Sequence, residues 1–557
     1  MLEKGRTEKQ VCAGWAIFVC VLVFSEFLGV RLQAAEEVRA AEITCLYVAV
    51  TFGISALAGV IMYRLLPIIL QKFSERREKH LPVTRTVGMR VFISIWGILF
   101  LCYLPCFFAF YPGLYNNDMS WQWQMYITGH FSTHHPLLHT WMAGWLFELG
   151  KLLFGSYNAG LALYCIIQLL ILSACIAIAL RYLLQIGCSK IIFGVVALFY
   201  GIYPYIPVMG LSTTKDAVFG PLFLVIFVCL CDMVKRQEIY RGWKLAGFLG
   251  LLAVAGMFRN NAVYSFGLTG IFLLILLLFP KFRRACGLFL GKIAMLLFVG
   301  VLFAQCGLVS MKTACGAESG KKNEMFSIPC QQLARTYLSH EKEMTEEEKQ
   351  EIFHYIPEEA MLQYTYYISD PVKNNLDEAA LKKDFSGFLK VWVKNGIKYP
   401  SSYMKAFLNQ NFGIWYLLGN TGSNIPYSYR DPVDEEHIFT EDSRIPWLKN
   451  IYMWFHYENY EKYLPFMSMV FYMPFFCWMT VWGSVSVWAV KKRCVWILPV
   501  FLLSYIFTVL LGPCIPVRYL FNILLCAPFF CAVLRFMPET AQGDGNGKTE
   551  NKTEKNA

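Results

Sequence analysis

Apolar segments long enough to cross a membrane recur along almost the whole chain. A membrane-spanning helix needs about 20 apolar residues. Here 56% of the residues are hydrophobic and only 16% are charged, against about 25% charged residues in soluble domains. The sequence therefore predicts an all-α polytopic membrane protein with about twelve transmembrane helices. The predicted spans are 11–30, 43–66, 91–111, 157–183, 190–208, 216–234, 243–258, 262–279, 287–309, 464–490, 494–512 and 517–536.

Lysine and arginine residues predict the orientation of these helices. The formal net charge is +11, but the basic residues concentrate in short segments beside apolar runs, at 72–80, 235–244, 281–284 and 491–493. This distribution is the positive-inside pattern of membrane proteins, and no known nucleic-acid-binding module accompanies the charge. We therefore expect a multi-pass protein of the cytoplasmic (plasma) membrane, with both termini and these segments in the cytoplasm and no nucleic-acid partner.

The predicted topology divides the chain into five regions. These are two N-terminal transmembrane helices with a basic cytoplasmic loop (1–90), a transmembrane core with an outward loop at 112–156 (91–310), a mostly helical extracytoplasmic domain between the ninth and tenth spans (311–463), C-terminal transmembrane helices (464–536) and a disordered cytoplasmic tail (537–557). The sequence leaves open whether Cys315 and Cys330, both in the extracytoplasmic domain, form a disulfide.

The outward loop at 112–156 is the densest in groups that bind ligands or transfer protons. Asp118 lies in it, beside Trp121 and Gln122, which are predicted to bind the substrate. A carboxylate that is partly desolvated at a membrane surface can act as a base near neutral pH. Asp118 is accordingly the predicted catalytic residue, and a solvated loop acid or a helix N-cap is the alternative.

Histidines follow Asp118 in the same loop. Pro136 at a first helical position would put His135 before a helix and His139 in its first turn, four residues apart and able to face one ligand. His134 adjoins them. Three interpretations stay open: a divalent metal held with Asp118 as a further ligand, binding of phosphate or sugar, and an interfacial helix with incidental histidines. No HExxH or DxD pattern is present.

Cations at the outward ends of later spans could converge on the same space. Lys215 starts a predicted helix, where an anion is favoured, and Arg259 between two apolar segments is costly unless it is functional. Such cations suit a phosphate-bearing lipid. The alternatives are an ion pair of Lys215 with Asp216 and a snorkelling anchor at Arg518. The predicted binding residues of this group are Lys215, Asp216, Arg259, Asn260, Asn261, Arg518 and Tyr519.

Several segments of the chain resemble known sequences. They are YPGLYNNDMSWQWQ (111–124), HHPLLHT (134–140), STTKDAVFGPLF (212–223), FRNNAVYSFG (258–267), FSIPCQQLARTY (326–337) and PVRYLFN (516–522). Taken together they resemble a bacterial family, domain-of-unknown-function family 6020, over about residues 91–536. The layout of spans and the acid in the first large outward loop resemble the GT-C class of membrane glycosyltransferases.

The GT-C resemblance implies transfer of a sugar from a polyprenyl-phosphate donor, with Asp118 as the base for the acceptor. Many members carry a second acid or a DxD-like pair, whereas this chain has Asn116-Asn117-Asp118. By charge and side, Lys215, Arg259 and Arg518 would bind the lipid phosphate. No cofactor is implied beyond the open alternative of a divalent metal.

We therefore expect a membrane glycosyltransferase that uses a polyprenyl-phosphate-linked sugar and an envelope glycan, lipid or protein acceptor at the outer membrane face. Its partners would be membrane lipids, the donor and the acceptor. A transporter or lipid flippase is one alternative, although its ionisable residues would be expected in mid-span. A non-catalytic membrane scaffold for envelope assembly is the other.

Overall fold

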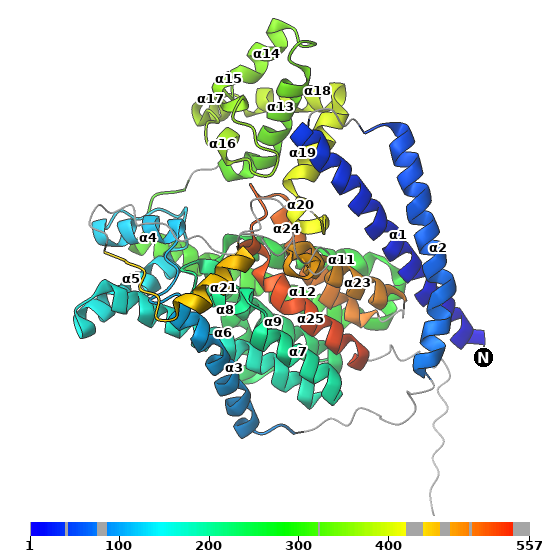
Figure 1. Ribbon diagram of the computed structural model, residues 1–557, viewed down its shortest axis with the longest axis vertical. Coiled ribbons are helices and arrows are strands. Elements are labelled where there is room, and N and C mark those ends of the chain that lie inside the picture. The colour runs from blue at the N-terminus through cyan, green and yellow to red at the C-terminus, as the bar shows by residue number, and fades with distance from the viewer. Residues whose placement is uncertain are drawn as a thin grey trace, which may run out of the picture.

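The computed structural model of the protein describes residues 2–38, 43–74, 86–320, 323–418, 438–456, 468–489 and 493–537. Within these ranges the chain forms helices joined by turns. The described residues contain a few isolated β-bridges but no β-strand (Figure 1). The prediction of an all-α protein is therefore confirmed. The predicted disordered tail after residue 537 and most of the basic segment at 72–80 lie outside the described residues.

Every predicted span coincides, over its described residues, with one or more helices. The helices are α1 (Leu2–Val38), α2 (Cys45–Ser74), α3 (Met89–Ala109), α6 (Tyr157–Gln185), α7 (Lys190–Ile202), α8 (Tyr205–Leu211), α9 (Lys215–Arg236), α10 (Gly242–Phe258), α11 (Asn260–Leu278), α12 (Pro280–Ala314), α23 (Met473–Ala489), α24 (Ile497–Leu510) and α25 (Phe521–Val533). The agreement follows from composition, because a long apolar run in lipid must pair its backbone groups internally and does so as a helix.

The number of spans is less well defined than their positions. In the described residues, 7 helices are long and apolar enough to cross a membrane, or 8 if the bent pair α7 and α8 forms one span. The helices at Gly242–Phe258, Cys494–Leu510 and Val517–Val533 are apolar but shorter. The chain is therefore a multi-pass membrane protein, while the count of twelve and the sidedness stay predictions.

Helix α9 forms the axis of the membrane core. Its ring-bearing residues pack against neighbouring helices: Phe223 stacks on Phe501 of α24 with ring centroids 4.5 Å apart, and Phe227 contacts Phe530 of α25 edge-on. Phe223 and Phe227 are both fully buried. This packing fixes the two ends of α9, each of which carries charged residues.

The polar region between α12 and α23 contains a compact helical domain, seen above the membrane core in Figure 1. Its helices are α13 (Ser327–His340), α14 (Glu346–Phe353), α15 (Glu358–Met361), α16 (Asp370–Lys373), α17 (Glu378–Lys383), α18 (Phe385–Lys398), α19 (Pro400–Gln410) and α20 (Phe412–Trp415). The domain has its own core, in which Tyr337, Ile352 and Phe388 are fully buried. The predicted helical character of 311–463 holds in its described part, and residues 321–322, 419–437 and 457–463 lie outside that part.

Two sets of contacts join this domain to the membrane helices. Arg335 of α13 forms an ion pair with Glu36 of α1. The Ser369 backbone N–H donates to the Pro513 carbonyl at 2.9 Å, in the segment before α25. The polar domain therefore contacts both the N-terminal and the C-terminal membrane helices or the segments beside them.

Cys315 and Cys330 are both free thiols. Cys330 is buried in the core of the polar domain, whereas Cys315 accepts a hydrogen bond from the indole N–H of Trp141 at 3.2 Å. The structure therefore contains no disulfide between these two residues.

Candidate functional site

A short backbone pairing brings the first outward loop to the start of α9. The Leu114 N–H donates to the Leu211 carbonyl at 3.1 Å, and the Thr213 N–H donates to the Leu114 carbonyl at 3.0 Å. The side-chain amide of Asn116 adds a hydrogen bond to the Ser212 hydroxyl at 3.2 Å. The segment before α4 (Asn117–Thr128) is thereby fixed against the segment before α9.

Asn116, rather than Asp118, is the N-cap of α4. Its side-chain oxygen accepts from the Met119 N–H, which satisfies one of the free donors at the helix start. The interpretation of Asp118 as an N-cap is therefore wrong. Asp118 lies in the first turn of α4, and its side chain is left to make other contacts.

Asp118 contacts two cations, and we call Asp118, Lys215 and Arg518 the Asp118 cluster. Its Oδ2 accepts a hydrogen bond from Nη1 of Arg518 at 2.7 Å and lies 3.6 Å from Nζ of Lys215. The three side chains keep between 17% and 28% of their surface exposed. Burial raises the pKa of the Asp118 carboxyl, but the charges of Arg518 and Lys215 outweigh it and hold that pKa well below its usual range. Asp118 is therefore an ionised carboxylate that a ligand can reach.

A second ion pair lies beside the cluster and is closed to solvent. Arg259 pairs with Asp216, and these side chains are 5% and 1% exposed. The Arg259 guanidinium also lies 4.5 Å from the centre of the Tyr519 ring, and that of Arg518 lies 5.2 Å from it. Tyr519 therefore contacts a guanidinium of each ion-paired group.

These contacts overturn two interpretations of the sequence. Lys215 does not pair with its neighbour Asp216, because Lys215 contacts Asp118 while Asp216 contacts Arg259. Arg518 is no snorkelling anchor, since its guanidinium binds Asp118. Consecutive residues of a helix point in different directions, which explains why adjacent charges have separate partners.

The Asp118 cluster lies where the N-terminal ends of helices meet. Asp118 lies in the first turn of α4, Lys215 is the first residue of α9, and Arg518 lies in the short 3₁₀ helix Val517–Leu520 that precedes α25. A helix N-terminus carries partial positive charge and free N–H donors. Together with the two cations of the cluster, these ends favour an anion at this position.

A buried chain of hydrogen bonds connects α4 to the segment before α9. It passes through His139 of α5 (Leu137–Phe154). His139 Nδ1 lies 2.6 Å from Oε1 of Gln122, and Nε2 lies 2.7 Å from the Tyr164 hydroxyl. Tyr164 donates to Gln168, whose amide donates to the Ser212 carbonyl at 3.1 Å. His139 and Gln122 are therefore positioning residues that hold α4 against α5 and α6.

Tyr164 and Gln168 were not predicted as site residues, because they lie inside the apolar run 157–183. A glutamine in a membrane-spanning segment is itself a signal, because a polar group there must find a partner. The four-residue spacing of Tyr164 and Gln168 puts both on one helix face. That spacing could have identified them.

His135 interacts electrostatically with all three members of the Asp118 cluster. It is buried, its Nδ1 has no hydrogen-bond partner, and burial together with the charge of Lys215 lowers its pKa to about 3. Pro136 is the N-cap of α5 rather than its first residue, so His135 precedes the helix as predicted. His135 is therefore a neutral, buried ring with one unpaired nitrogen.

The residues present do not fit the divalent-metal interpretation. Both ring nitrogens of His139 are occupied by Gln122 and Tyr164. In the part of the chain that the structure describes, no group of three or more His, Cys, Asp or Glu side chains could hold a metal ion. Asp118, His135 and His139 therefore do not form a metal-binding group in the described part of the chain.

Four other predicted binding residues lie at the margin of the site. Trp121 and His134 are exposed, and the His134 ring packs edge-on against His135. Asn260 is exposed and Asn261 half-buried in the first turn of α11, where neither makes a hydrogen bond to the Asp118 cluster. The structure therefore does not bring these four side chains into the cluster.

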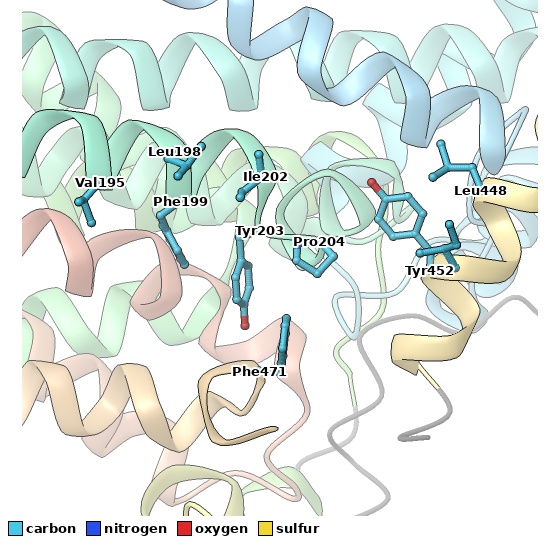
Figure 2. Close-up of a pocket in the computed structure, with 10 residues that line it drawn as sticks. Val195, Leu198, Phe199, Ile202, Tyr203, Pro204, Leu448, Tyr452 and Phe471 are labelled. Carbon is cyan, nitrogen blue, oxygen red and sulfur yellow. The ribbon is translucent and has the colours of Figure 1, made fainter. Parts of the chain in front are cut away.

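An apolar pocket of about 550 Å³ lies between α7 and α21 (Pro446–His456). Figure 2 shows side chains of α7 along one side and Leu448 and Tyr452 of α21 on the other. Pro204, at the start of α8, also lines it. Helix α8 has 7 residues, about 10 Å at 1.5 Å per residue, and ends beside Ser212. The pocket thus begins one short helix away from the loop that positions Asp118.

The comparisons with known proteins give a family. The model of DUF6020, a family of unknown function, matches residues 123–550. Lys215 and Arg518 lie inside this match, whereas Asp118 lies before it. No curated protein and no solved structure matches the chain, so the resemblance to GT-C glycosyltransferases has no support from these comparisons. Because the match covers more than half of the sequence, the chain belongs to DUF6020.

Proposed function

We propose that this protein is a membrane glycosyltransferase that moves a sugar from a polyprenyl-phosphate donor to an envelope glycan, lipid or protein acceptor, at the outer face of the plasma membrane. The observation that carries the proposal is the Asp118 cluster, an ionised carboxylate with two accessible cations where helix N-termini meet. A carboxylate suits removal of an acceptor proton, and the cations suit a phosphate leaving group.

In the proposed reaction, an acceptor hydroxyl oxygen attacks the anomeric carbon of the sugar. The bond between that carbon and the phosphate oxygen breaks, and the polyprenyl phosphate leaves with the electron pair. Asp118 accepts the hydroxyl proton, while Lys215 and Arg518 stabilise the negative charge that grows on the phosphate. The acceptor gains the sugar and loses its proton to Asp118, and the phosphate keeps the electron pair of the broken bond.

The low pKa of ligand-free Asp118 fits a role for the donor in activating the base. A carboxylate held by two cations is a weak base, because protonation would forfeit both interactions. A bound phosphate would compete for Arg518 and Lys215. Their weaker hold on Asp118 would raise its pKa toward the range in which a carboxylate accepts a proton. Donor binding would thereby prepare the base.

The apolar pocket between α7 and α21 supports a lipid-linked donor over a soluble nucleotide sugar. Its lining is apolar apart from Tyr hydroxyls, as an isoprenoid chain requires. Its end at Pro204 is about 10 Å, the length of α8, from the Ser212 loop. We assign the proximal isoprene units to this pocket and the phosphate to Lys215 and Arg518.

The test is sugar transfer by the purified protein in proteoliposomes supplied with radiolabelled polyprenyl-phosphate sugars. Asp118→Asn keeps the shape of the side chain and removes the base, so we expect transfer to fall by roughly 10²–10⁴-fold. Asp232→Asn is the matched control, since Asp232 pairs with Arg236 near the opposite end of α9. That variant should transfer at the wild-type rate.

Retained transfer in Asp118→Asn would remove Asp118 from the role of base. Movement of labelled lipid across the bilayer without any glycosyl product would favour a flippase instead. If no donor class gives either sugar transfer or movement of lipid across the bilayer, the non-catalytic scaffold is the interpretation that remains. Melting curves of both variants establish that each is folded.

A further inference from the structure

A second pocket lies at the other end of α9 from the Asp118 cluster. It has a volume of about 480 Å³, within the roughly 300–1,000 Å³ typical of small-ligand sites. The connection between α9 and α10 forms one wall, and the first turns of α12 form the other. Its lining residues include Glu238, Arg241, Arg283, Arg284 and Lys292.

The charge of this pocket is unbalanced. Four of its lining residues are cationic and Glu238 is the one acid among them. In the described part of the chain, none of Arg241, Arg283, Arg284 and Lys292 forms an ion pair with an acid. Cations gathered around one concavity repel one another, and an anion inside it would relieve that repulsion. The pocket therefore fits a negatively charged group.

The length of α9 puts this pocket at the opposite membrane surface. Helix α9 has 22 residues, which span about 33 Å at 1.5 Å per residue, close to the roughly 30 Å hydrocarbon core of a bilayer. Trp243, just after the α9–α10 connection, is 80% exposed, and Lys244 lies over its ring. Exposed tryptophans of this kind are enriched at membrane–water interfaces. The pocket thus lies at the depth of lipid headgroups.

An apolar stripe leads from the pocket along α12. Leu288 lines the pocket, and Met295, Leu302 and Val309 follow at seven-residue intervals, which places them on one helix face. Their exposed fractions lie between 60% and 76%. The backbone of Cys286 is non-helical, so α12 bends between the arginines and this stripe. A cationic pocket continuous with an uncovered apolar stripe matches an amphipathic ligand.

We propose that this pocket binds the headgroup phosphate of an anionic phospholipid, one acyl chain of which lies along the Leu288–Val309 stripe of α12. Charge complementarity selects an anionic headgroup, and the stripe selects a lipid over a free phosphate. The site is separate from the proposed transfer site, and it stands whether or not the protein is a glycosyltransferase.

The first test counts bound lipids by native mass spectrometry of the whole protein, released from micelles after exchange into phosphatidylglycerol or phosphatidylcholine. We expect wild type to retain phosphatidylglycerol preferentially. Arg283→Gln/Arg284→Gln/Lys292→Gln should retain it on the order of 100-fold more weakly, about fivefold per charge. Lys244→Gln removes a charge at the same surface outside the pocket lining and should differ little from wild type. Equal retention by the triple variant, or equal retention of both lipids, would overturn the site.

A second measurement does not depend on the triple variant being folded. A photoreactive residue at Leu288 should crosslink to labelled phosphatidylglycerol in vesicles, and one at Leu362, exposed in the polar domain, should not. Excess inorganic phosphate should leave the Leu288 crosslink intact. Loss of the crosslink with phosphate would show a site for a soluble anion, and equal labelling at both positions would show non-specific contact. Either result contradicts the proposal.

Discussion

Two carboxylate–cation groups meet at the N-terminal end of α9 and differ in their access to solvent. Asp216 and Arg259 are almost completely enclosed, and the aromatic ring of Tyr519 covers the guanidinium. Asp118, Lys215 and Arg518 keep between 17% and 28% of their side-chain surface exposed. Both groups pair an aspartate with basic side chains, so the kinds of charge present do not identify the group that binds a ligand.

The difference separates a structural role from a binding role. A buried ion pair cannot exchange its partner without exposing a charge to an apolar surrounding, which costs several kcal/mol. The Asp118 cluster keeps part of its surface exposed, so an incoming phosphate can reach Lys215 and Arg518 and take the place of the carboxylate as their partner. We therefore interpret Asp216–Arg259 as a fixed support that orients α9 and α11, and the Asp118 cluster as the part that responds to ligands.

The largest effect on stability is expected at the closed pair. Arg259→Met leaves the Asp216 carboxylate buried without a partner and should lower the stability of the folded state by about 3–5 kcal/mol. A fall in melting temperature in micelles measures this. Arg236→Met is the control, because it breaks an ion pair with Asp232 in which the arginine is 62% exposed, and it should cost at most about 1 kcal/mol.

A double variant sharpens the same comparison. Asp216→Leu/Arg259→Met removes both charges and should recover most of the melting temperature, since a buried pair replaced by apolar residues is often no less stable. If Arg259 only supports the fold, the recovered protein also recovers its ligand binding. A stable double variant that no longer binds polyprenyl phosphate would return Arg259 to the binding site, as the sequence had indicated.

The open group should show the reverse pattern, with binding affected more than stability. Arg518→Gln removes a charged donor and should weaken polyprenyl-phosphate binding by about 1.5–3 kcal/mol, roughly 10- to 150-fold. Titration in micelles gives this Kd. Its melting temperature should stay close to that of Arg444→Gln, a control that breaks the exposed Arg444–Asp442 pair. Unfolding as severe as in Arg259→Met would show that the cluster is structural.

The sequence was sufficient to locate the helices and to bring Asp118, Lys215 and Arg518 to one face of the membrane. Apolar runs fix helix positions, and alternation of spans fixes which ends lie together. Ion pairing was not predictable, because the direction of each side chain depends on the rotation of its helix. Lys215 and Asp216 are adjacent in sequence yet point to different partners.

The support beneath the site was also hidden in the sequence. Tyr164 and Gln168 lie in a long apolar run, and their partners come from other helices. Conversely, Trp121 was expected in the site because of its residue type, and it is exposed. Residue type indicates what a side chain can do, while tertiary packing decides whether it reaches the ligand.

The smallest effect is a pH dependence that begins at His135, the buried neighbour of the open group. Its pKa is about 3 in the folded protein and about 6.5 when unfolded, so folding favours the neutral ring. This contribution to stability is complete above about pH 6.5 and is lost as the pH falls from there toward 3. At pH 5 the stability lost is about 2 kcal/mol. Between pH 7.5 and 5, wild type should therefore lose more melting temperature than His135→Gln.

His134→Gln is the matched control for this measurement, because His134 is the adjacent residue and is exposed. It should lose melting temperature in parallel with wild type. Bound polyprenyl phosphate should reduce the loss in wild type, since an anion beside His135 stabilises the protonated ring and raises its pKa. Protection by the ligand in wild type but not in His135→Gln would connect His135 to the open group. Equal protection in both would limit the phosphate contacts to Lys215 and Arg518.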